Sequence, residues 1–118
     1  MITDSHSLQS TTLTLFCYLR GDHYTQTFPV EIDKEKSAGY LKEVIKEKKR
    51  PKFDNLPADS LFLWNVSVPI NRDLINGVEA LNLLEDDALS PSRILTDIFP
   101  DLEKDCIHFV IDQYSGEL

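Results

Sequence analysis

The chain has 118 residues, a length that suits one domain and is too short for two. Its formal net charge of −8 at pH 7 argues against non-specific binding of nucleic acid by the chain as a whole. An apolar share of 42% and a charged share of 27% are typical of a globular protein, and the sequence holds no apolar run that could span a membrane.

The start of the chain predicts a tail followed by a β-hairpin. Residues 1–10 are polar, lack the apolar run of a classical signal peptide, and are expected to form a flexible tail. Residues 12–20 and 24–32 alternate between apolar and polar side chains, as half-buried strands do, on either side of a turn at Gly21. Together they predict an N-terminal hairpin.

A helix and a third strand are expected next. Ser37 suits a helix N-cap, and the apolar residues of 38–49 recur at helical spacing until Pro51 ends the helix. Residues 60–68 form a short apolar run that predicts a strand, and Pro69 limits its extension.

The second half of the chain is less regular. Residues 70–91 are acidic and rich in asparagine, with scattered leucines and at most a short strand near 80–84. Residues 93–99 predict a brief helix, and residues 106–113 predict the last strand.

This order of elements describes an α+β fold of the β-grasp, or ubiquitin-like, kind. Such a fold packs a mixed sheet of four to five strands on one main α-helix, here with a short second helix, and its first and last strands pair in parallel at the centre. We expect the domain to cover residues 11–113, with 114–118 as a C-terminal tail or the start of a linker.

Basic residues gather at the end of the predicted helix. Their segment carries a net charge of +4, with only Glu43 and Glu47 among them, and leaves −12 for the rest of the chain. This charge separation indicates either a solvated helix face with a basic loop, or a surface that orients an acidic partner or a second copy. The basic patch consists of Lys42, Lys46, Lys48, Lys49, Arg50 and Lys52.

The sequence shows no pattern of catalytic or metal-binding residues. The three histidines, His6, His23 and His108, have no zinc-ligand spacing, and the four glycines form no phosphate-binding loop. Cys17 and Cys106 lie in apolar runs and are expected to be buried thiols. We therefore expect no catalytic site, no metal and no cofactor.

One face of the predicted sheet is rich in aromatic side chains. If Leu61 and Leu63 point inward, their neighbours along the strands point outward, which predicts a recognition surface or an oligomer interface. The alternative is that residues 70–91 fold over this face and make Trp64 part of the core. The candidate interaction face comprises Phe16, Tyr18, Phe62, Trp64, Val66, His108 and Val110.

The order and spacing of these elements resemble the N-terminal domain of Crinkler effector proteins of oomycetes and fungi. The family's Leu-Phe-Leu-Ala-Lys motif corresponds here to Leu61, Phe62, Leu63, Trp64 and Asn65, with Trp64 in place of alanine and Asn65 in place of lysine. The fungal branch continues with Val-Ser and a proline, here Val66-Ser67-Val68-Pro69, and the last strand begins with Ile107-His108. The resemblance spans roughly residues 12–112.

This resemblance implies a non-catalytic, ubiquitin-like N-terminal domain of a secreted effector. Such a domain is associated with secretion and with translocation into host cells, here by a route without a classical signal peptide, to the host cytoplasm or nucleus. Its partners would be proteins, either of the host or a second copy of the chain, with no nucleic acid bound by this domain alone. The alternative is an intracellular β-grasp adaptor that binds an acidic protein through the basic end of the helix.

Overall fold

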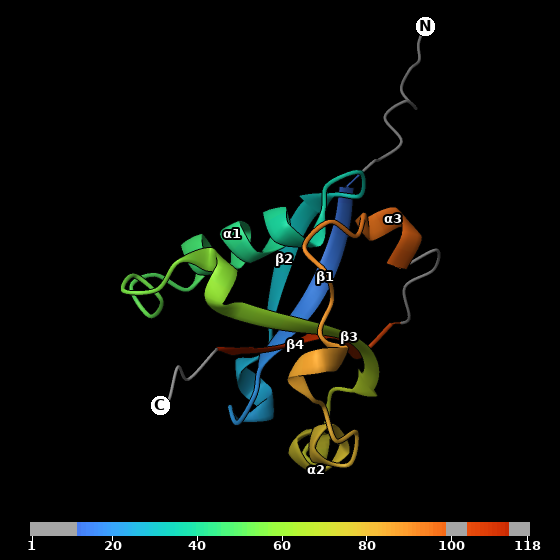
Figure 1. The fold of residues 1–118 in the computed structure, drawn as a ribbon. Helices are drawn as coiled ribbons and strands as arrows, with labels where there is room; N and C mark the ends of the chain where they lie inside the picture. The colour runs from blue at the N-terminus through green and yellow to red at the C-terminus, as the bar shows by residue number, and fades with distance from the viewer. Residues whose placement is uncertain (1–11, 99–103, 114–118) are drawn as a thin grey trace, which may run out of the picture.

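The computed structural model describes residues 12–98 and 104–113, and Figure 1 shows their fold. They form one mixed sheet of four strands with helices on both of its faces. The strands are β1 (Thr12–Leu19), β2 (Phe28–Asp33), β3 (Leu61–Pro69) and β4 (Cys106–Gln113). The helices are α1 (Ala38–Lys48), α2 (Leu74–Glu79) and α3 (Leu95–Ile98), with 3₁₀ turns η2 (Tyr24–Gln26), η3 (Ala58–Ser60) and η4 (Glu85–Asp87).

The strand order β2-β1-β4-β3 places the first and the last strand side by side at the centre of the sheet. β1 runs parallel to β4, while β2 and β3 run antiparallel to their neighbours at the two edges. The predicted α+β fold is confirmed with four strands, and its arrangement is consistent with a β-grasp.

The N-terminal hairpin forms because its apolar side chains alternate in register. Leu15 pairs with Val30 and Cys17 with Phe28, so all four side chains point to the same buried face. Gly21 has a φ of +93°, a conformation that glycine adopts without strain, and it turns the chain after β1. β2 begins later than predicted, because residues 24–26 form η2 instead.

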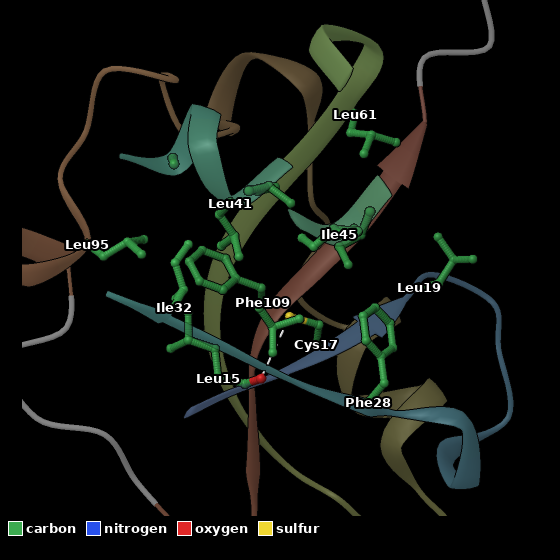
Figure 2. Close-up of a cluster of buried hydrophobic side chains, with 14 of the residues drawn as sticks. Leu15, Cys17, Leu19, Phe28, Ile32, Leu41, Ile45, Leu61, Leu95 and Phe109 are labelled. Carbon is green, nitrogen blue, oxygen red and sulfur yellow. Dashed lines mark hydrogen bonds between the residues drawn. The ribbon is translucent and has the colours of Figure 1, made fainter. Parts of the chain in front are cut away.

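Helix α1 covers the first face of the sheet. The hydroxyl of Ser37 accepts a hydrogen bond from the N–H of Tyr40 at 3.1 Å, which confirms the predicted N-cap. Leu41 and Ile45 point down onto the sheet, where they meet Phe109 and its neighbours in the first hydrophobic cluster (Figure 2). Burying each such side chain contributes about 1.5–3 kcal/mol.

A distant segment, residues 91–96, completes the cap of α1. The N–H groups of Ala38 and Gly39 donate to the carbonyls of Arg93 and Pro91, at 2.7 and 2.9 Å. These donors are among the four that a helix start leaves without an internal partner. In return, the N–H of Leu95 donates to the carbonyl of Lys36 at 2.9 Å, so the segment is fastened at both ends.

Three details of the second half differ from the sequence predictions. Residues 80–84 form no strand, because the chain turns there after α2. The brief helix predicted over 93–99 is α3, which begins only at Leu95, while Phe99 lies outside the described residues. The predicted tails, 1–10 and 114–118, also lie outside them.

The register between β3 and β4 shifts once along the pair. Asn65 pairs with Phe109, yet Val68 pairs with Ile107, so β3 uses one residue more than β4 between these pairs. Near this shift, Ile107 packs with Val68 in a second hydrophobic cluster, away from Phe109 and Ile111, with which simple alternation would group it.

Candidate interaction surfaces

The sheet face opposite α1 is covered by residues 70–91. Leu74 and Val78, four residues apart on one side of α2, pack onto it and bury it in the second hydrophobic cluster. The prediction of an exposed face is wrong for four of its members, and the structure has the alternative arrangement in which Trp64 belongs to the core. The buried members are Tyr18, Trp64, His108 and Val110.

Each large aromatic side chain on this face has a partner for its polar group. The indole N–H of Trp64, a residue only 4% exposed, donates to the carbonyl of Leu84 at 2.8 Å. The hydroxyl of Tyr18 donates to the carbonyl of Asp22 at 2.7 Å. Leaving such a buried polar group without a partner costs stability, so these two bonds help to hold the covering segment and the turn after β1 in place.

His108 has a structural place in the sheet. The N–H of Phe16 in β1 donates to Nδ1 of His108 at 3.0 Å, and the two rings lie 6.1 Å apart. The acceptor role requires Nδ1 to carry no proton. His108 thus joins β1 to β4 through its side chain.

The remaining candidates lie partly at the surface. Phe16, Phe62 and Val66 are half-buried, and the ring of Phe62 lies 6.1 Å from that of Trp64. Of the predicted interaction face, only these three side chains remain partly accessible to solvent.

The family motif is mostly core. Leu61 and Leu63 are fully buried in the first cluster, and Trp64 is buried in the second. Asn65 is exposed and Phe62 is half-buried. A partner could therefore reach only these last two members.

The basic patch is smaller than the sequence suggests. Lys42 is only 7% exposed; burial lowers the pKa of its ammonium group, and the carboxylate of Asp59 opposes this shift. Arg50 lies 3.6 Å from Glu47 and 3.5 Å from Asp54, so its charge is locally balanced. The accessible remainder consists of Lys48 and Lys52, which are exposed, and Lys46 and Lys49, which are half-buried.

An apolar hollow of about 440 Å³ lies on the outer side of α1. Tyr40 is exposed there, and the ammonium of Lys36 lies 4.6 Å from its ring centre. The hollow is lined by Tyr40, Glu43, Val44, Glu47 and Lys48. Its lining combines apolar and charged groups.

The sequence predictions include neither Arg20 nor helix α2. The guanidinium of Arg20 lies 3.9 Å from Glu79 and 3.6 Å from Asp112, and its carbon is 5.9 Å from the ring centre of Trp64. It thereby joins β1, α2 and β4. The spacing of Leu74 and Val78 was the available signal, since it fits one side of a helix.

Both cysteine thiols of the described residues are shielded from solvent. Cys17 and Cys106 are free and buried, and burial raises the pKa of the Cys17 thiol to about 12. Within residues 12–98 and 104–113, no three acidic, histidine or cysteine side chains cluster as metal ligands. In the same ranges, no helix has the length and apolar character needed to cross a membrane.

The fold and its surfaces define a small α+β domain without a recognisable catalytic centre in its described part. The model of the Crinkler effector protein N-terminal domain matches residues 13–112, and the chain belongs to this family. The chain is also 37% identical, over 101 residues, to Crinkler effector protein 1 of Rhizophagus irregularis. That match covers 85% of this chain and 21% of the relative, so the chain spans about a fifth of the relative's length.

Proposed function

We propose that this chain is the non-catalytic N-terminal domain of a Crinkler-type effector, which serves secretion and translocation into host cells through contacts with other proteins. The observation that carries this proposal is the family match over residues 13–112, nearly the whole chain. The route would be one without a classical signal peptide, ending in the host cytoplasm or nucleus.

A delivery assay tests this proposal. The full chain is fused to a reporter that becomes active only in the host cytosol, and the effector-producing organism is applied to host cells. We expect a signal that the reporter alone does not give. A fusion that is made and stays folded but never reaches the cytosol would contradict the delivery role.

One double variant separates a delivery signal from core packing. Phe62→Ala combined with Asn65→Ala changes the accessible members of the motif and leaves Leu61 and Leu63 in place. If the motif is read by a receptor, this double variant loses delivery although circular dichroism shows it folded. Its urea midpoint should fall only in part, because Phe62 packs at the edge of the second cluster. Normal delivery by the folded double variant would mean that the motif only supports the core.

Contacts between copies of the chain are part of the same proposal. Charge separation and the hollow beside Tyr40 favour them. Sedimentation at roughly tens of micromolar is expected to show species heavier than the 13.5 kDa chain. A single 13.5 kDa species at every concentration would remove self-association from the proposal.

The charge separation also favours a second candidate, an adaptor that binds an acidic protein. Binding to an immobilised poly-glutamate peptide is the probe. An electrostatic contact weakens sharply between about 50 and 300 mM salt, because exposed charges are screened over roughly 10 Å or less. Lys48→Glu with Lys52→Glu should abolish it, whereas Lys104→Glu, an exposed lysine outside the patch, should not.

A further inference from the structure

We infer that this domain is a mechanical clamp, which resists unfolding when force is applied through the two ends of the chain. The first and last strands of the domain are neighbours at the centre of the sheet and run parallel. Because they are parallel, the start of β1 and the end of β4 lie at opposite ends of their shared ladder (Figure 1). Opposite pulls on these two points slide β1 and β4 lengthwise past each other.

The ladder between β1 and β4 would be loaded as a unit. It pairs Cys17 with Phe109, Tyr18 with Val110 and Leu19 with Ile111. Under a lengthwise pull all these pairs bear force together, so the chain yields only when they break together. Under a sideways pull, as at the open end of an antiparallel hairpin, the pairs break one after another and each needs little force.

Two further hydrogen bonds lengthen this ladder at its ends. Beyond Leu19, the N–H of Arg20 donates to the carbonyl of Ile111 at 2.8 Å. Before Cys17, the N–H of Phe16 donates to Nδ1 of His108 at 3.0 Å. The second bond gives His108 a specific role, because its side chain extends the contact between β1 and β4 to Phe16, one residue before their ladder begins at Cys17.

Both faces of this ladder are shielded from water. Cys17 and Phe109 lie in the cluster between the sheet and α1, as Figure 2 shows, while Tyr18 and Val110 lie beneath the layer of α2. Water competes for hydrogen bonds that it can reach, so a dry ladder must be broken by force alone. The segment 70–91, which the sequence suggested to be irregular, thereby strengthens the central strands.

The consequence for delivery rests on the proposed function. A machine that pulls this chain by one end while the other end is held has to shear β1 from β4 before any edge strand can be peeled away. Forced unfolding depends on the barrier to unfolding rather than on the equilibrium free energy, so this barrier decides whether the domain passes folded.

Single-molecule pulling of the purified 118-residue chain tests the clamp. In one geometry the handles are attached at the two chain ends. In the other, they are attached at the N-terminus and at position 35 of the variant Glu35→Cys. Glu35 is exposed and lies beyond β2, near the open end of the hairpin, where Thr12 pairs with Asp33. The native cysteines are buried and should not take up the handle. We expect a several-fold higher unfolding force between the chain ends. Equal forces in the two geometries would overturn the clamp.

Variants at His108 test its share in the clamp. His108→Ala removes the acceptor of the Phe16 N–H. We expect it to lower the unfolding force measured between the chain ends and to leave the force measured between the N-terminus and position 35 nearly unchanged. His108→Asn keeps an acceptor near the position of Nδ1 and should restore part of the force. If His108→Ala fails to fold, the unfolding forces of the parent chain in the two pulling geometries still test whether the clamp exists. These forces are measured without host cells, so a failed delivery assay leaves them standing, and a failed clamp leaves the delivery proposal standing.

Discussion

Neighbouring residues of the motif have opposite environments. Leu63 has no exposed surface, whereas Asn65, two positions later, faces solvent. Substitutions within the motif therefore change either the core or the surface, and a loss of function has to be assigned to one of them by measuring stability.

Leu63→Ala is expected to lower the free energy of unfolding by about 2–5 kcal/mol, because it leaves a cavity in the first cluster. Asn65→Ala is the matched control, with an expected change within about 0.5 kcal/mol. Urea unfolding measures both. Similar losses for the two variants would contradict the burial described for Leu63.

Cys17 makes stability depend on pH in the alkaline range. Its thiol has a pKa of about 12 in the folded chain against an ordinary value of 9.0, so the unfolded chain loses this proton first. The free energy of unfolding should therefore be unaffected by Cys17 below about pH 9 and fall above it, by at most roughly 1.4 kcal/mol per pH unit.

Cys17→Ala isolates this contribution, because it keeps the other groups that titrate at alkaline pH. The difference in unfolding free energy between parent and variant should be constant at neutral pH and should shrink above about pH 9. A constant difference up to about pH 11 would show that the thiol titrates normally in the folded chain.

At the scale of elements, the most unexpected feature is the layer made by residues 70–91. Gly77 of α2 lies so close to β3 that an added Cβ would be 2.9 Å from a methyl group of Val68. The helix can approach the sheet only because this position has no side chain. Leu74 and Val78 of the same helix pack in the cluster that contains Trp64.

Gly77→Ala is expected to push α2 away from β3, although alanine favours a helix by about 1 kcal/mol over glycine. Trp64 is the only tryptophan, so its fluorescence reports on this layer. Acrylamide should quench the parent weakly and the variant more strongly. Equal quenching, together with increased stability, would mean that α2 accommodates the methyl group without moving.

The sequence was sufficient for elements whose partners are near in the chain. The alternation in β1 and β2, the N-cap at Ser37 and the stop at Pro51 are local signals, and the structure has a hairpin and a helix there. It was insufficient where distant segments meet. Nothing near Ala38 indicates that Arg93 supplies the acceptor for its N–H, and only the packed fold decides whether Trp64 is covered.

At the scale of the whole molecule, two hydrophobic clusters share the central strands. Phe109 and Ile111 of β4 belong to the cluster beneath α1, while Ile107 and Val110 belong to the cluster beneath α2. Loss of either cluster therefore exposes one face of the same strand.

We accordingly expect the domain to unfold as one unit. Far-ultraviolet circular dichroism, which follows the helices and the sheet, and Trp64 fluorescence, which follows the second cluster, should give the same midpoint in urea. An earlier fluorescence transition would show that the layer of α2 unfolds separately from the sheet.

The central place of β4 also determines when a chain made from its N-terminus can fold. Until Cys106–Gln113 has been synthesised, the β1–β2 hairpin and β3 have no common neighbour, since β4 lies between them. Contacts that are this distant in sequence form late. The four-stranded sheet therefore cannot form while β4 is still inside the ribosome. A partner that binds during synthesis would meet an unfolded chain, whereas one that binds afterwards would meet the folded domain.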